Sequence, residues 1–330
     1  MHYIFLALML FILLLIYFKI ADHYNIIDKP NHRSAHSEIT LRGGGIIYPI
    51  AFLLFLTNLF IGHNSTDNFQ NYFIFGLGML ALCTISFIDD ILDLSSKIRL
   101  VFHFISVTLL LYFINAFQLL PIWAIPILFI VIIGILNAYN FMDGINGMTG
   151  LYSLVILSTL LYINQNLTKF TDDNFIIYPI VASLVFLFFN FRKKAKCFMG
   201  DIGSMGVAFW VLALLGLLMM KTQDIKYILF LTVYGVDVVL TIVERFKLKE
   251  NIFEAHRRHL YQLFSNEKKV SHLIISSIYT LLQLIINVLV ILLKFPNWFI
   301  FAMIILPILL LYIIIKYYIK KNLHVNKNEN

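Results

Sequence analysis

The chain has 330 residues, of which 60% are hydrophobic and only 13% are charged. Soluble domains carry about 25% charged residues, so this composition excludes an ordinary soluble protein. It predicts an all-α integral membrane protein that crosses the bilayer many times, since apolar segments cross membranes as helices. The two cysteines give neither a disulfide framework nor the spacing of a metal site.

Apolar segments long enough to cross a bilayer recur along the whole chain. Each has about 16 to 23 residues, close to the ~20 that a spanning helix needs. They predict about eleven transmembrane helices, or ten without the weakest segment, within a single domain of residues 1–330. The polar segment 322–330 is expected to be a disordered cytoplasmic tail. The segments are 1–18, 46–62, 72–88, 100–116, 121–139, 148–163 (the weakest), 175–190, 205–220, 226–243, 271–293 and 297–317.

Lysine and arginine gather in the loops on one side of these spans. Of the 25 in the chain, 21 fall in 19–45, 89–99, 191–204, 244–270 or the tail from Lys316. Because short basic loops stay in the cytoplasm, the N-terminus is expected outside and the C-terminus in the cytoplasm. The same asymmetry accounts for the net charge of +7, so no nucleic-acid partner is expected.

The first basic loop ends with Arg42 and three glycines, Gly43, Gly44 and Gly45. Glycines permit a tight turn that brings backbone N–H groups toward an anion, and an arginine side chain can bind two phosphate oxygens at once. The loop is therefore a candidate phosphate site. The alternative is a basic cytoplasmic turn without a ligand.

Three acids, Asp89, Asp90 and Asp93, stand at the end of the 72–88 span. Carboxylates at the end of a membrane span are costly and indicate function. Caps of a helix N-terminus would explain one of them but not an adjacent pair, because neighbouring carboxylates repel unless a cation lies between them. Mg²⁺ bound together with a phosphate substrate is such a cation.

Asn137, Asn140 and Asp143 recur every three residues at the end of the 121–139 span. In a helix they would line one face, and the glycines that follow at 144 and 147 would let a ligand approach the backbone. The alternative is that the asparagines bond neighbouring helices together in the membrane. That alternative does not explain Asp143.

Two further clusters stand in later basic loops. Asp201, between Gly200 and Gly203, is expected to expose its carboxylate beside room for a ligand, and Asn190 closes the preceding span; a capped turn is the alternative. In the longest loop the chain reads His256-Arg257-Arg258-His259. These side chains are donors for an anion, although such a pattern alone also fits a solvated surface.

Together, from Asp28 to Gln262, these segments resemble the polyprenyl-phosphate N-acetylhexosamine-1-phosphate transferases of glycosyltransferase family 4. The resemblance implies transfer of N-acetylhexosamine 1-phosphate from a UDP-sugar to undecaprenyl phosphate, with release of UMP and the start of lipid-linked surface glycan synthesis. It also implies a bacterial inner membrane protein whose active site faces the cytoplasm, with a homodimer left open. Tyr261 and Gln262 stand where relatives often have histidines, as in the branch that begins O-antigen or capsule synthesis with GlcNAc or a 6-deoxy sugar. Asn146 stands where many relatives have aspartate.

The resemblance also assigns roles. Mg²⁺, with Mn²⁺ as a substitute, is expected on Asp201, and the catalytic acids are expected to be Asp89, Asp90 and Asp201. Asp89 and Asp90 are expected at the lipid phosphate. The substrate-binding residues are expected to be Arg42, Asn140, Asp143, Asn190, His256, Arg258 and His259, with His259 at the diphosphate.

Elementary chemistry agrees with a phosphoryl transfer, which needs positioning and neutralised charge. A phosphate monoester is largely dianionic at pH 7, so Asp89 or Asp90 is expected to position the lipid phosphate and not to act as a base. Two other classes stay open. An ion-coupled transporter would hold its acids near the midplane on broken helices within repeats, and a non-catalytic lipid-binding protein would release no UMP.

Overall fold

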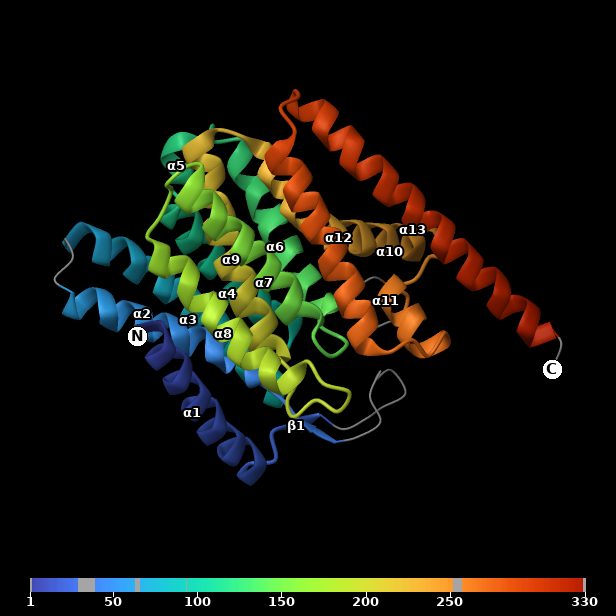
Figure 1. The fold of residues 1–330 in the computed structure, drawn as a ribbon, viewed down its shortest axis with the longest axis horizontal. Helices are drawn as coiled ribbons and strands as arrows, with labels where there is room; N and C mark the ends of the chain where they lie inside the picture. Colours follow the sequence, from blue (N-terminus) through green and yellow to red (C-terminus); the bar gives the residue numbers. More distant parts are fainter. Residues whose placement is uncertain (1, 29–38, 63–65, 93, 252–256, 329–330) are drawn as a thin grey trace.

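The computed structural model describes residues 2–28, 39–62, 66–92, 94–251 and 257–328, and helices dominate it (Figure 1). Arg33, Asp93 and His256 lie outside the described residues. The elements in chain order are α1 (His2–His23), β1 (Ile27–Asp28), β2 (Thr40–Leu41), η1 (Gly44–Ile46), α2 (Ile47–Ile61), α3 (Thr66–Leu92), α4 (Ser96–Phe113), α5 (Ala116–Leu119), α6 (Ala124–Met142), α7 (Met148–Asn166), α8 (Asp173–Asn190), α9 (Gly200–Thr222), η2 (Ile225–Leu231), α10 (Thr232–Lys247), α11 (Leu260–Gln262), η3 (Leu263–Glu267), α12 (His272–Leu292) and α13 (Asn297–Asn328).

All eleven predicted spans are helical, and the all-α membrane fold is confirmed. Ten helical segments of the described chain are long and apolar enough to cross a membrane. The exception is α7, the predicted weakest span, which carries buried Thr149, Ser153, Thr159 and Asn164. It is nevertheless an interior helix, packed against α8 and α12.

Helix α9 forms the centre of the bundle, and α13 lies at its edge (Figure 1). The apolar stretch of α9 is 89% buried, whereas that of α13 is only 17% buried. Trp210 of α9 is fully buried and donates from Nε1 to the Phe175 carbonyl oxygen at 2.9 Å. A buried polar group needs such a partner, and the lipid-facing helices need none because their exposed side chains are apolar.

The loops predicted on the basic side meet at one end of the bundle. Helices α1, α3, α6, α8 and α10 end there, and α2, α4, α7, α9 and α12 begin there. The only paired strands among the described residues, β1 and β2, lie at this end, and Leu41 of β2 bridges to Cys197. The other end has its own contacts, such as that between Tyr72 Oη and Thr171 Oγ1 at 3.0 Å. Clustering of these loops brings residues from several polar motifs to one site.

The C-terminus differs from expectation. Helix α13 continues to Asn328 and so covers most of 322–330, for which a disordered tail was predicted. A polar segment has no apolar face to pack against the bundle. A helix can nevertheless extend beyond its last apolar turn, because each added residue forms one more backbone hydrogen bond.

Candidate functional site

A cavity of about 240 Å³ lies at the end where these loops meet. Side chains from at least five separate segments of the chain surround it, so it exists only in the folded protein. Of the predicted site residues, the cavity wall includes Arg42, Asn140, Asp143, Asn190 and Asp201. The other lining residues are Asp28, Gly144, Ile145, Asn146, Phe198, Met199, Gly200, Ser204, Gln262, Asn266 and His272.

One corner of the site is charged. Arg42 Nη2 lies 2.7 Å from Asp90 Oδ1 and 3.2 Å from Asp201 Oδ1, so one guanidinium is shared by two carboxylates. The Asp90 side chain is 0% exposed and the Asp201 side chain 21%. Burial lowers the pKa of Arg42, but the charges of Asp90 and Asp201 outweigh this effect and raise it overall. The guanidinium therefore stays charged.

Asp90 holds the start of the central helix. Its carboxylate accepts hydrogen bonds from the backbone N–H groups of Asp201, at 2.9 Å, and Ile202, at 3.4 Å. An acid at a helix N-terminus satisfies free N–H groups and the helix dipole. Asp90 thus caps α9, a helix far away in sequence, and turns Asp201 toward the cavity.

The adjacent Asp89 points elsewhere. Its Oδ2 lies 2.9 Å from Arg99 Nη1, and its Oδ1 accepts from Leu94 N at 2.7 Å. Asp89 does not line the cavity. Asp89 and Asp90 therefore have different partners in this structure, because consecutive helical residues point about 100° apart. A cation shared between them stays a prediction.

The glycine loop binds protein and not an anion. Gly44 N donates to the Phe198 carbonyl oxygen at 2.8 Å, and Gly45 N donates to the Met199 carbonyl oxygen at 2.9 Å. The expectation that these N–H groups face a phosphate is thus wrong. The expected close approach is present: a Cβ on Gly45 would lie 2.1 Å from the Gly203 Cα.

Amide side chains dominate the opposite wall. Asn190 accepts from Gly147 N at 2.6 Å and donates to the Cys197 carbonyl oxygen at 2.8 Å, so it fastens two loops together. Asn137 lies apart from its predicted partners, because its Nδ2 donates to the Ile133 carbonyl oxygen of its own helix. Of the asparagine triplet, only Asn140 and Asp143 reach the cavity.

Asn146 is a buried residue of the cavity wall. Its Nδ2 donates to the Arg192 carbonyl oxygen at 2.8 Å, which fixes the orientation of the amide. Its Oδ1 is buried without a hydrogen-bond partner among the described residues. Such an atom costs about 1–3 kcal/mol unless a ligand or water donates to it.

Asp143 lies at the base of the amide wall, where burial raises the pKa of its carboxyl well above the usual value. The Thr149 side chain opposes that rise in pKa, and the charges of Asp201 and Asp90 add to it. The carboxyl therefore keeps its proton to a higher pH than a free aspartate does.

The histidine loop contacts carboxylates of its own protein. His259 Nδ1 lies 3.1 Å from Asp237 Oδ1, and Arg258 pairs with Glu250 and with Glu244, the latter at 3.2 Å. Neither His259 nor Arg258 lines the cavity. Both were predicted to bind substrate, and the structure does not place them there.

Other side chains of the same region take their place. Gln262, Asn266 and His272 line the cavity, as does Asp28 from β1. Sequence reasoning noted Gln262 only as a departure from the histidine pattern. No local signal marked Asn266 or His272, because their approach depends on how η3 and α12 pack.

The charged corner suits a divalent cation that is bound together with a substrate. Among the described residues, no group of three or more His, Cys, Asp or Glu side chains could hold a metal. Mg²⁺ usually takes one or two carboxylates and completes its shell with water and substrate phosphates. Asp201, beside Asp90, meets that requirement.

Comparison with known proteins indicates a family. The model of glycosyl transferase family 4 matches residues 72–221, which include most of α3, the cavity-lining 140–146 segment and α9 up to its last residue but one. This central part of the chain is therefore similar to members of that family. The match excludes the histidine loop and also the cavity-lining residues Asp28, Arg42 and His272.

Several named members of the family are similar over most of the chain. A probable undecaprenyl-phosphate N-acetylglucosaminyl 1-phosphate transferase of Bacillus subtilis is 27% identical over 78% of this chain and 75% of its own length. An undecaprenyl-phosphate alpha-N-acetylglucosaminyl 1-phosphate transferase of Escherichia coli K12 is 28% identical over 78% and 74%. A phospho-N-acetylmuramoyl-pentapeptide-transferase of Petrotoga mobilis is 30% identical over 50% and 56%.

Proposed function

We propose that this protein transfers N-acetylhexosamine 1-phosphate from a UDP-sugar to undecaprenyl phosphate and releases UMP. The observation that carries the proposal is the composition of the cavity, where a charged corner faces an amide wall. Relatives named for the same transfer cover about three quarters of the chain, which supports the choice of substrates. The sugar is N-acetylglucosamine or a 6-deoxy-N-acetylhexosamine.

The two sides of the cavity suggest how the sugar nucleotide lies. Arg42 carries positive charge for the diphosphate, and Asp201 adjoins it at 3.2 Å. The opposite wall carries the uncharged amides of Asn140, Asn146 and Asn190, and amide side chains can hydrogen-bond the polar groups of a sugar or base. The diphosphate therefore lies in the charged corner, and the neutral groups lie along the amide wall.

Mg²⁺ in the charged corner would be held by Asp201, which lines the cavity, and it would neutralise charge on the diphosphate. Arg42 contributes a second positive charge there. Asp90 is occupied by Arg42 and the α9 backbone, which supports a positioning role for it and not a role as general base.

In the proposed reaction, an oxygen of the lipid phosphate attacks the β-phosphorus of the UDP-sugar. The bond from that phosphorus to the bridging oxygen breaks, and UMP leaves with the bridging oxygen and its electron pair. Since the lipid phosphate is already largely dianionic at pH 7, no side chain has to remove a proton. The protein supplies position and positive charge.

The test is a screen of UDP-sugars with purified protein, undecaprenyl phosphate and Mg²⁺. We expect UMP release and a lipid whose mass increases by one sugar phosphate. We expect one UDP-sugar to give more of both products than the others. Lipid binding without UMP release from any UDP-sugar would favour a non-catalytic lipid-binding protein. Ion-dependent uptake into vesicles without UMP release would favour a transporter.

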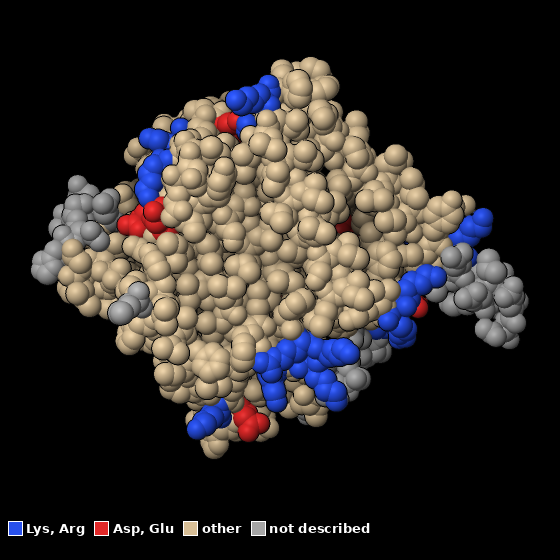
Figure 2. Space-filling model, viewed as in Figure 1, with Lys and Arg blue, Asp and Glu red and all other residues tan. Residues whose placement is uncertain are grey.

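We also propose that the cavity faces the cytoplasm from a bacterial inner membrane. Basic side chains support this orientation: Lys193, Lys194 and Lys196 are exposed at the cavity end. Figure 2 shows Lys and Arg along the lower edge of the molecule, with further Lys and Arg at its top and upper left. Lys193→Cys should react with impermeant reagents only from the cytoplasm, and Lys169→Cys, at the other end, only from outside. The native cysteines are both buried. Labelling of both variants from one side would overturn the orientation.

The homodimer expected from the resemblance stays a prediction. Light scattering of the purified protein in detergent measures it, since a dimer has twice the protein mass of the 38.4 kDa chain.

A further inference from the structure

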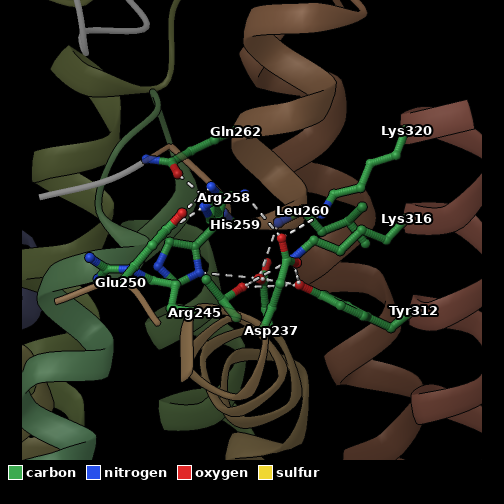
Figure 3. Close-up of polar contacts among 12 residues, drawn as sticks. Asp237, Arg245, Glu250, Arg258, His259, Leu260, Gln262, Tyr312, Lys316 and Lys320 are labelled. Atoms are coloured by element: carbon green, nitrogen blue, oxygen red, sulfur yellow. Dashed lines mark hydrogen bonds and ion pairs between the residues drawn. The ribbon is translucent and has the colours of Figure 1, made fainter. Parts of the chain in front are cut away.

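A buried carboxylate outside the cavity, Asp237 of α10, holds the beginning of the 257–267 segment. Asp237 is 1% exposed. Its Oδ1 lies 3.1 Å from His259 Nδ1 and also accepts from Leu260 N at 3.1 Å (Figure 3). One side chain therefore fixes both the imidazole ring and the backbone of the segment.

Two other helices contribute donors to the same carboxylate. Tyr279 of α12 donates from its hydroxyl to Asp237 Oδ2 at 2.8 Å, and Tyr312 of α13 donates to Oδ1 at 3.2 Å. Thr241, one turn along α10, donates to Oδ1 at 3.3 Å. A carboxylate surrounded by donors acts as an acceptor. The proton between Asp237 and His259 consequently belongs to Nδ1, whether the ring is neutral or charged.

The segment that Asp237 holds leads directly to the cavity. Gln262 lines the cavity, and its Oε1 accepts from His259 N at 3.2 Å. Tyr261 lies between these residues and donates from its hydroxyl to the Phe141 carbonyl oxygen at 2.8 Å. A shift of the 259–260 backbone, which Asp237 holds, would therefore displace Gln262 from the cavity wall.

A second carboxylate on the same helix holds the neighbouring residue. Glu244 follows Asp237 by two helical turns and so lies on the same face of α10. It pairs with Arg258 at 3.2 Å and with Lys316 of α13 at 2.9 Å. Lys320 of α13 pairs with it as well (Figure 3). The two carboxylates thus connect the segment to the peripheral helix α13 at two points.

We propose that Asp237 is a positioning residue: by fixing the His259 ring through Nδ1, it places Gln262 and Asn266 against the neutral part of the sugar nucleotide, and α13 braces this contact through Tyr312. The identity of the ligand rests on the proposed function, whereas the Asp237–His259 geometry does not. This assigns His259 to holding the cavity wall. It also gives a lipid-facing helix a part in substrate binding.

The first measurement needs no substrate. ¹⁵N NMR of histidine-labelled protein, with His259→Gln to assign the ring, reports which ring nitrogen carries the proton. We expect Nδ1 of His259 to be protonated in the parent at every pH where the protein is folded. In Asp237→Asn the amide can also donate, so we expect a share of molecules with the proton on Nε2 only. A parent ring with its single proton on Nε2 would overturn the proposal.

The second measurement is a double-mutant cycle. We expect Asp237→Asn to weaken binding of UDP-N-acetylglucosamine with Mg²⁺ by about 10- to 100-fold, the range seen when a partner that orients a histidine is lost. Because Asp237 acts through His259, adding Asp237→Asn to His259→Gln should cost less than about threefold more. If the fold-losses in binding of the two single variants multiplied in the double variant, Asp237 would act independently of His259, and the proposal would fail.

Two variants control for loss of the fold. Asp224→Asn makes the same substitution in η2's N-cap at the other end of the bundle, and its binding should equal that of the parent. Tyr312→Phe removes one donor from Asp237 and keeps His259 paired, so it should weaken binding within about fivefold. Equal losses in Asp237→Asn and Asp224→Asn would contradict the proposal. A parent that binds no UDP-sugar would refute the transferase function, and the His259 resonance would still decide the geometry.

Discussion

The two walls of the cavity are held by different kinds of contact. The wall of residues 42–46 and 197–204, the backbone-held wall, is joined mainly by main-chain hydrogen bonds and by Gly45 packed against Gly203, with one ion pair between Arg42 and Asp201. The wall of residues 257–267, the ion-paired wall, is joined to α10 through His259 and Arg258. Main-chain bonds do not depend on charge. Ion pairs depend on ionisation and, where exposed, on salt.

This difference matches the work that each wall is proposed to do. Asp201 lies on the backbone-held wall, where small displacements would misalign a phosphoryl transfer. Gln262 lies on the ion-paired wall, beside the part of the substrate that does not react. A rigid wall suits chemistry, and an adjustable wall suits recognition of different sugars.

The largest expected effect comes from Asp201→Asn on the backbone-held wall. This substitution keeps the size of the side chain and removes the charge that would hold Mg²⁺, so turnover should fall by at least about 10²- to 10³-fold. The melting temperature in detergent should change little, because the side chain is partly exposed. Glu244→Gln on the ion-paired wall is the comparison, and its turnover should fall far less. Similar turnover in Asp201→Asn and the parent would move the metal ligand elsewhere.

The next largest effect tests the backbone contact itself. In Gly45→Ala, the new Cβ would lie 2.1 Å from the Gly203 Cα, and such overpacking costs about 1–3 kcal/mol. The melting temperature should fall and turnover with it. Gly134→Ala is the control, since no atom lies within 4 Å of its Cβ position. If both variants melted alike, the close approach of the two loops would not hold this wall.

How far the sequence predicts the site also differs between the walls. Local composition predicts the spans, the basic end of the bundle, and the positions of Arg42 and Asp201. It can do so because apolar length and glycine spacing are properties of short segments. The direction of the Asp89 side chain depends on its angular position around helix α3, which turns it toward Arg99. The fate of His259 depends on Asp237, a single acid inside an apolar span more than twenty residues away. No local pattern connects those two residues.

Asp90 shows the same limit of prediction from sequence. The sequence raised the idea that acids after α3 cap a helix, and Asp90 does cap one, but that helix is α9. A cap between distant helices leaves no spacing signal, because the two residues meet only after the loops are folded together. Tertiary contacts of this kind cannot be predicted from spacing alone.

The two walls meet at the 143–147 segment, where Asp143→Asn should produce a pH-dependent change in stability. Because burial raises the pKa of Asp143 in the folded state, the folded protein binds more protons than the unfolded chain, whose aspartate pKa is about 3.9. The stability from Asp143 is therefore complete below about pH 4 and is lost as pH rises to the folded pKa. Melting temperatures of the parent and of Asp143→Asn should diverge in favour of the variant as pH increases. A constant difference would contradict the raised pKa.

The smallest effect should come from Glu244→Gln on the ion-paired wall. Glu244 is 19% exposed and pairs with Arg258 and Lys316, and partly exposed pairs contribute about 0–1 kcal/mol. Lys316 would keep its hydrogen bond to Tyr312 at 2.8 Å, so the melting temperature should fall only slightly. Salt should weaken UDP-sugar binding more in the parent than in Glu244→Gln, because only the parent retains the carboxylate that salt screens. Equal salt dependence in both proteins would show that Glu244 does not help to hold this wall.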